Sequence, residues 1–159
     1  MPEDHPHTPK HHEPNRVDIM RHRFETGDLA FSPITATLGL QITTIEKGRA
    51  RGTVKYDPKF ANPAKVMQGG IISAILDDVM GFAVASTMNL DETGMGLELK
   101  TSFFGAVREG EYTAEGYLQK RGKRIVFAEA TLTDSEGNLV AKASSTFALI
   151  KREALTKPE

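Results

Sequence analysis

The sequence contains no cysteine, so neither a disulfide framework nor thiolate chemistry contributes to this protein. It has almost no net charge, because 20 basic side chains face 21 acidic ones, whereas nucleic-acid-binding domains carry a clear basic excess. It also lacks a secretory leader pattern and an uninterrupted apolar run long enough to span a bilayer. We therefore expect a cytoplasmic protein that binds neither nucleic acid nor membranes.

The 159 residues fit a single domain, and a hydrophobic content of 39% is enough to build one core. Residues 1–14 are rich in proline, histidine and charge, and we expect a disordered tail there. Four of the five histidines lie in this tail. A metal-binding tract is the alternative to a solvated tail, but no ligand spacing repeats, so we expect no metal.

Residues 15–30 are predicted to form an N-terminal helix laid against the main domain. Asn15 is a suitable N-cap, and Gly27 suits the end of the helix. Val17, Met20 and Phe24 recur at helical spacing between them. The main domain is expected to span residues 31–151, followed by a polar tail at 152–159.

The main domain alternates between a period of two and one long apolar segment, which predicts strands around a single helix. The expected order is a hairpin, a helix and four further strands, at 38–46, 49–56, 69–88, 97–103, 112–119, 126–133 and 139–150. A helix that is apolar on most sides must be buried around most of its circumference. We therefore expect an α+β hotdog fold, with an antiparallel sheet wrapped around one helix and a second chain helping to cover it.

Two adjacent carboxylates, Asp77 and Asp78, interrupt the apolar helix in the stretch NPAKVMQGGIISAILDDVMG, residues 62–81. Burying an ionised carboxylate is costly unless it is paired, so an acid in this position suggests a function. Gly70, Ser73 and Asp77 form one narrow polar or small face, where a substrate could approach. Asp78 could bind substrate, or it could lie at an exposed position or bind loop amides.

The Gly69-Gly70 pair stands at the expected start of the helix. The first N–H groups of a helix lack internal partners, and glycine lets a ligand approach them closely. An oxyanion hole for an acyl carbonyl is one interpretation, and a tight loop-to-helix entry is the other. Together with a carboxylate two turns further on, the pair indicates acyl transfer chemistry.

The same stretch resembles the core motif of PaaI-like hotdog acyl-CoA thioesterases, which have an asparagine, then His-Gly-Gly, then an acid on the helix. The segment GEYTAEGYLQKRGKRIVFAEATLTDSEGNLVAKASSTFALI resembles the closing strands of that family. The resemblance implies that Asn62 positions water or the acid, that the Gly69 amide polarises the thioester carbonyl, and that Asp77 is general base or nucleophile. It also implies that Asp77 faces Gly69 of a second protomer, in a homodimer or dimer of dimers.

The sequence departs from the family pattern at two positions. Gln68 stands where the family usually has histidine, so the side chain can donate a hydrogen bond but cannot carry a proton near neutral pH. Gly96 falls where some members have a serine, and Thr93 or Thr101 is the nearest hydroxyl that could replace it. Both departures bear on rate and substrate choice more than on fold.

The run KRGKR at residues 120–124 lies in a predicted turn. We expect Arg121, Lys123 and Arg124 to contact the phosphates of coenzyme A, which enters as part of an acyl-CoA substrate and not as a separate cofactor. A solvated hairpin is the alternative for this run. Two other functions stay open: a non-catalytic acyl-CoA-binding module, and a hydratase or dehydratase, against which the lack of histidine after His22 argues.

Overall fold

A computed structural model describes residues 15–28, 30 and 32–155 of the chain. The two expected tails at 1–14 and 156–159 lie outside the described residues. The elements, in chain order, are α1 (Arg16–Glu25), α2 (Pro33–Leu38), β1 (Gln41–Glu46), β2 (Arg49–Lys55), the 3-10 turn η1 (Pro58–Phe60), α3 (Gly69–Ala85), β3 (Glu92–Phe103), β4 (Glu111–Arg121), β5 (Ile125–Thr133), β6 (Leu139–Lys151) and the 3-10 turn η2 (Arg152–Leu155).

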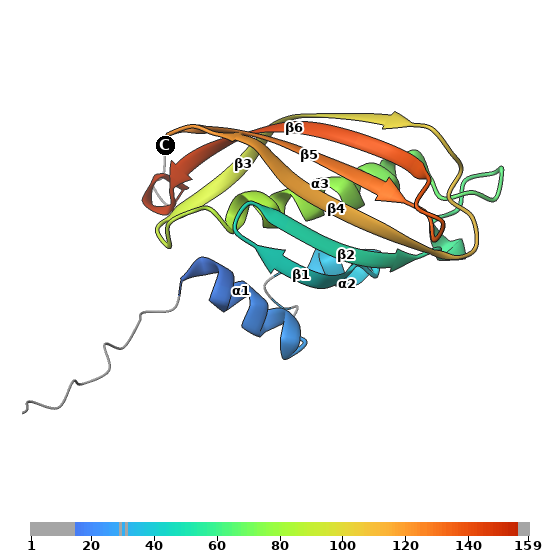
Figure 1. The fold of residues 1–159 in the computed structure, drawn as a ribbon, viewed down its shortest axis with the longest axis horizontal. Coiled ribbons are helices and arrows are strands. Elements are labelled where there is room, and N and C mark those ends of the chain that lie inside the picture. The colour runs from blue at the N-terminus through green and yellow to red at the C-terminus, as the bar shows by residue number, and fades with distance from the viewer. Residues whose placement is uncertain (1–14, 29, 31, 156–159) are drawn as a thin grey trace, which may run out of the picture.

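Six strands form one antiparallel sheet in the order β1-β2-β4-β5-β6-β3. The sheet curves around α3, which Figure 1 shows lying along the inside of the strands. The strands of the second half form a meander, while β3 crosses over to pair with the last strand. The predicted hotdog fold is therefore confirmed.

The helix α3 packs closely against the sheet because small residues of the strands face it. Eight of its residues are buried, and they come from the apolar positions that predicted the helix. Gly116 of β4 lies so near the helix that an added Cβ would stand 2.5 Å from the backbone oxygen of Val79. The helix ends at Ala85, three residues before the predicted end at Met88, and the chain turns there.

Replacing Gly116 with alanine is expected to destabilise the protein by about 1–3 kcal/mol, the usual range for overpacking a tight core. The contact is with helix backbone and not with the end of a flexible side chain, so the sheet or helix must shift. Chemical denaturation measures this difference. Gly81→Ala is the matched control, because a Cβ there meets nothing within 4 Å and alanine favours the helix. Equal stability of Gly116→Ala and wild type would contradict the close packing.

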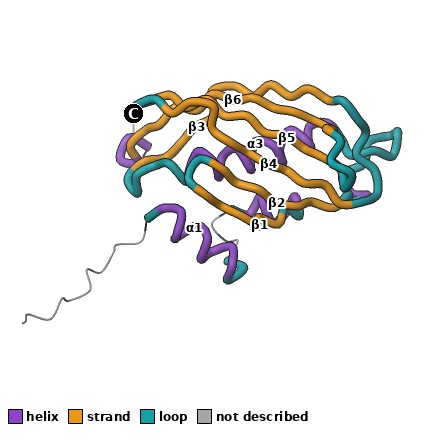
Figure 2. Tube along the Cα trace, in the orientation of Figure 1, coloured by secondary structure: helices purple, strands orange, loops and turns teal. Residues whose placement is uncertain are grey.

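The predicted N-terminal helix forms, but it spans only Arg16–Glu25 of the expected 15–30. The side chain of Asn15 accepts a hydrogen bond from the backbone N–H of Asp18 at 3.1 Å, and Gly27 adopts a left-handed φ of 70°. The rings of Phe24 and Phe82 pack edge to face at 5.0 Å between centroids, which fixes α1 beside α3. Figure 2 shows α1 beside β1 at the edge of the sheet, where the side chain of Arg21 donates to the carbonyl of Ile45 at 3.1 Å.

The helix α2 was not predicted, and the expected strand at 38–46 is wrong at its start. Leu38 ends α2, and the strand β1 begins only at Gln41. The sequence does carry a signal for this short helix, since Pro33 occupies its first turn and Gly39 ends it with a left-handed φ of 70°. The apolar spacing of a six-residue helix is too short to distinguish from a strand.

The strand β3 forms an uncovered edge of the sheet, because it pairs only with β6. Leu97, Leu99 and Phe103, apolar residues of the predicted strand at 97–103, are 60%, 40% and 51% exposed in the single chain. A long apolar edge strand without a cover is rare in stable proteins, since it invites pairing with another strand. In the single chain the apolar side chains of this edge are left uncovered.

Candidate active site

The loop before α3 is held by Asn62. Its side-chain oxygen accepts hydrogen bonds from the backbone N–H groups of Ala64 and Val66, at 2.9 and 3.3 Å. The backbone N–H of Asn62 also donates to the carbonyl of Val66 at 2.8 Å. These bonds set the path by which the chain enters the helix. The oxygen of Asn62 is thus engaged within its own loop.

Gln68 stands at the N-cap position of α3 and is exposed. Its side chain makes no capping hydrogen bond, whereas its backbone carbonyl accepts from the N–H groups of Ile71 and Ile72. Its backbone N–H donates to Phe60 at 2.8 Å, which joins η1 to the helix start. The side-chain amide of Gln68 is therefore free to orient a bound group at this end of the helix.

The N–H groups of Gly69 and Gly70 open the helix. Among the described residues neither donates to a protein acceptor, as is usual for the first amides of a helix. The ring of Phe103 lies over Gly69, and an added Cβ would stand 3.1 Å from its outer carbon. A Cβ on Gly70 would meet nothing within 4 Å. The first amides therefore sit beside an apolar ring and have donors available for an oxyanion.

Asp77 lies two turns further along α3, on the side of the helix that the sheet does not cover. Its side chain is exposed in the single chain, so the expectation of an acid inside the core is wrong for the isolated chain. Neighbouring protein nevertheless removes part of the water around the carboxylate, and this burial raises the pKa of Asp77 above the usual 3.8. A carboxylate with a raised pKa is a better general base.

Asp78 is more enclosed and has a partner within the chain. The hydroxyl of Thr35, a fully buried residue of α2, donates a hydrogen bond of 2.7 Å to its carboxylate. The hydroxyls of Ser32 and Thr35 are also 2.7 Å apart. Burial raises the pKa of Asp78, the Thr35 hydrogen bond opposes that rise, and the nearby charge of Asp77 adds to it. Asp78 thus joins α2 to α3.

The polar stripe predicted on α3 is present, but its members differ in availability. The hydroxyl of Ser73 donates to the carbonyl of Gly69 at 3.0 Å, so its proton is used within the helix. Thr101, a candidate replacement for the missing serine, has a buried hydroxyl without a hydrogen-bond partner among the described residues. Thr93 lies further away, in the wall of a cavity beside the end of α3.

The basic run does form a turn between β4 and β5, as predicted. The guanidinium of Arg121 is already engaged within the chain, because it donates to the carbonyl of Gly122 and pairs with Glu92 at 3.5 Å. Lys123 and Arg124 are exposed. Figure 1 shows this turn at the same end of the molecule as the C-terminus of α3. The loop that leads into α3 lies at the opposite end.

The two central groups of the predicted site do not meet within one chain. Asp77 lies eight positions after Gly69, which corresponds to about 12 Å along a helix. The free N–H of Gly69 points beyond the start of the helix, away from Asp77. A carbonyl held by that amide would therefore lie out of reach of the carboxylate of the same chain. A site that uses both groups needs two copies.

The sequence did not single out three other features of this region. The contact of Phe103 with Gly69 and the contact of Thr35 with Asp78 were not foreseen. Arg16 of α1 and Arg152 of η2 line the cavity beside the end of α3 and carried no recognisable pattern. Pairs that lie far apart in the chain leave no local signal in a single sequence.

No cluster of metal-ligating side chains occurs among the described residues. Within the same part of the chain, no helix is long and apolar enough to cross a membrane.

Comparison with known proteins identifies the family. The profile of the thioesterase superfamily matches residues 64–141, which include the helix start and both aspartates. A Saccharolobus solfataricus protein with a provisional esterase name is 30% identical over 120 residues, or 76% of this chain and 85% of that protein. The 1,4-dihydroxy-2-naphthoyl-CoA hydrolase of Listeria monocytogenes is 25% identical over 116 residues, or 73% of this chain and 94% of the hydrolase.

A solved structure agrees with these sequence matches. A phenylacetic acid degradation-related protein of Ralstonia eutropha, which carries a provisional thioesterase name, superposes with a TM-score of 0.73 at 27% identity. The match covers 80% of this chain and 97% of that one. The protein belongs to the thioesterase superfamily, and its fold is that of the PaaI-like hotdog members.

Proposed function

We propose that the protein hydrolyses acyl-CoA thioesters to a free acid and coenzyme A. Asp77 acts as general base on water, or as nucleophile, and the backbone N–H of Gly69 stabilises the oxyanion. The observation that carries this proposal is the pair of free amides at the start of α3, on the same helix as a carboxylate, Asp77, whose pKa burial raises. The Listeria relative acts on a CoA thioester, which agrees with this reaction.

We propose further that the working enzyme is at least a homodimer joined along β3. Pairing of two such edges would cover the exposed side chains of Leu97, Leu99 and Phe103. Phe103 already contacts Gly69, so an interface on β3 adjoins the start of α3. The same contact can bring Asp77 of one copy toward the amides of the other.

The reaction proceeds in a site that the dimer would shield from bulk water. Removal of water strengthens the hydrogen bond from Gly69 to the developing oxyanion and raises the pKa of Asp77 further. Gln68 donates its side-chain amide to the thioester or to the leaving group, in place of the proton transfer that histidine would allow. Asn62 acts through the loop that it holds, because its oxygen is bound to loop amides.

Release of free thiol from short, medium and aryl acyl-CoAs, followed with a thiol reagent, tests this function. We expect turnover that saturates with substrate for at least one of these classes. Calorimetric binding of acyl-CoA without any release of thiol would instead identify a non-catalytic acyl-CoA-binding module. If the whole panel showed no turnover and no binding, both functions would be contradicted.

A further inference from the structure

A cavity of about 780 Å³ lies beside the proposed thioester site, between α1, the second half of α3 and the start of β3. Four residues of α1 line it at the spacing of one helix face: Arg16, Ile19, Met20 and Arg23. Gly81 lines it from α3, one turn after Asp77, and leaves open space where a side chain would stand. The cavity has the size of a pocket for a small ligand.

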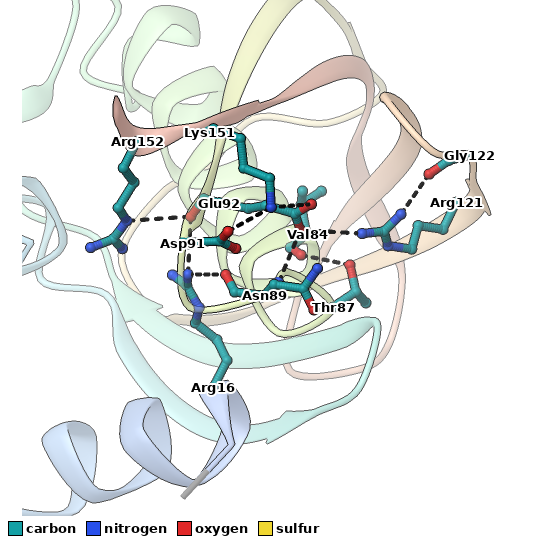
Figure 3. A network of polar contacts seen from close by, with 10 residues as sticks. All are labelled: Arg16, Val84, Thr87, Asn89, Asp91, Glu92, Arg121, Gly122, Lys151 and Arg152. Atoms are coloured by element: carbon teal, nitrogen blue, oxygen red, sulfur yellow. Dashed lines mark hydrogen bonds and ion pairs between the residues drawn. The ribbon is translucent and has the colours of Figure 1, made fainter. Parts of the chain in front are cut away.

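Two arginines stand at the end of the cavity that is farthest from Asp77. The guanidinium of Arg16 donates to the backbone carbonyls of Asn89 and Glu92, and that of Arg152 donates to the same Glu92 carbonyl at 3.4 Å. Figure 3 shows Arg16 and Arg152 on either side of the turn between α3 and β3. Within the described part of the chain, neither arginine has a carboxylate within 4.0 Å.

The nearby acids are already paired with other cations. Asp91 binds Lys151 at 2.6 Å, while Glu92 lies 3.5 Å from Arg121 and 3.9 Å from Lys151 (Figure 3). Their negative charge is therefore largely neutralised by these partners. Arg16 and Arg152 keep a positive charge that no carboxylate of the described residues contacts directly.

The guanidinium of Arg16 has a hydrogen-bond donor without an acceptor. Its Nε atom is buried and has no hydrogen-bond partner among the described residues. Burial, and then the positive charge of Arg152, lower the pKa of Arg16, and the charges of Glu92 and Asp91 oppose this only in part. An oxyanion between the two guanidinium groups would relieve their repulsion and fill the free donor positions.

We propose that this cavity receives one arm of the substrate and that Arg16 and Arg152 bind an oxyanion at the end of that arm. The inference rests on the proposed thioesterase function for the position of the thioester. Asp77 to the end of α3 at Ala85 spans about 12 Å, and Arg16 contacts the turn just beyond. Two arms of an acyl-CoA reach this far: a medium-length acyl chain with a terminal carboxylate, and the pantetheine arm with its phosphates.

Both arginines lie outside residues 64–141, the part that matches the thioesterase superfamily. The proposed anion site is made by the N-terminal helix and by the turn after the last strand. Asp78 lines the opposite part of the cavity, where its charge is tied to Thr35. The cavity thus has Asp78 near the thioester and Arg16 and Arg152 at the far end, with Arg23 lining it further along α1.

The test compares three substrates with wild type, Arg16→Gln, Arg152→Gln and the double variant. Octanoyl-CoA carries only the phosphates, suberyl-CoA carries a terminal carboxylate as well, and octanoyl-pantetheine carries neither. We expect KM for the substrate that presents the bound anion to rise at least ~10-fold in the double variant, with kcat within about twofold, because a charged hydrogen bond is lost from binding alone. Arg21→Gln, on the same helix but outside the cavity, is expected to leave KM unchanged.

The pattern of the loss identifies the source of the anion. A rise for both CoA substrates but not for octanoyl-pantetheine assigns the phosphates, and a rise for suberyl-CoA alone assigns the acyl carboxylate. Equal KM values for wild type and the double variant on all three substrates would overturn the proposal. Thermal melts of Arg16→Gln and Arg152→Gln show whether either change loosens α1. If Arg16→Gln loosens the helix, Arg152→Gln alone still tests the site.

A binding measurement separates this proposal from the thioesterase function. Titration calorimetry with free coenzyme A and with suberate needs no turnover, and at least one of them should bind wild type at least ~10-fold more tightly than the double variant. If no acyl-CoA is hydrolysed but this difference is found, the proposed reaction fails and the anion site stands. If thioesters are hydrolysed and no difference in binding is found, the anion site fails alone.

Discussion

Asp77→Asn is expected to lower kcat for acyl-CoA hydrolysis at least ~100-fold, the size typical of a lost general base or nucleophile. Asparagine keeps the shape of the side chain but can neither accept a proton from water nor attack the thioester. Thiol release under saturating substrate measures the change. Asp78→Asn is the matched control, because its carboxylate is turned toward Thr35 and should contribute far less to kcat. The reverse ranking would mean that the roles of the two aspartates are exchanged.

Asp77→Asn should not lose stability at neutral pH. Burial raises the pKa of Asp77 above its usual 3.8, so the folded state binds protons more tightly than the unfolded state. Stability that depends on this group is therefore highest below the unfolded pKa, and it falls as pH rises to the folded pKa. Asparagine does not ionise, so Asp77→Asn should melt at the wild-type temperature or higher at pH 7. A lower melting temperature at pH 7 would show that the ionised carboxylate stabilises the fold.

Gly69→Pro is expected to lower kcat by about 100- to 1,000-fold, the effect of removing one oxyanion donor. Proline lacks the N–H that Gly69 is proposed to use, and it is well tolerated in the first turn of a helix. The preceding Gln68 has φ −61° and ψ 135°, a conformation that proline allows in the residue before it. Because the Gly69 amide has no acceptor among the described residues, its loss breaks no hydrogen bond of the fold.

Gly69→Ala is the control for this substitution. Alanine adds a Cβ at the same place, 3.1 Å from the outer carbon of the exposed Phe103 ring, but it keeps the N–H group. We expect kcat of Gly69→Ala to stay within about tenfold of wild type, since one flexible ring must move. If alanine and proline reduced kcat equally, the contact with Phe103 would matter and the amide would not.

The two inactive variants together test whether the site is shared between copies. Unfolding and refolding a mixture of Asp77→Asn and Gly69→Pro chains gives mixed dimers, in which the intact Asp77 of one chain meets the intact Gly69 of the other. One of the two sites in such a dimer is complete, so about a quarter of wild-type activity should return in an equal mixture by random pairing. A site made by one chain would give no recovery.

Much of the fold follows from local features of the sequence. The period of two along the later strands, and the apolar α3 with its Gly-Gly start, predict an antiparallel sheet around one helix. The cap of α1 at Asn15 was also readable, because a cap depends on neighbours within three residues. The short α2 was missed, although Pro33 and Gly39 mark its ends, because six residues give too little periodicity.

The sequence by itself determined which groups are present: an acid two turns into a helix, two glycines that open it, and an apolar strand that follows. These are properties of spacing along one element, and spacing is written in the chain. Only the tertiary structure decided that Asp77 faces outward from its own chain, that Asp78 is bound by Thr35, and that Arg16 and Arg152 share one cavity. Those outcomes depend on how the sheet covers one side of α3 and leaves the other open, and contacts between residues so far apart in the chain form only when the whole core packs.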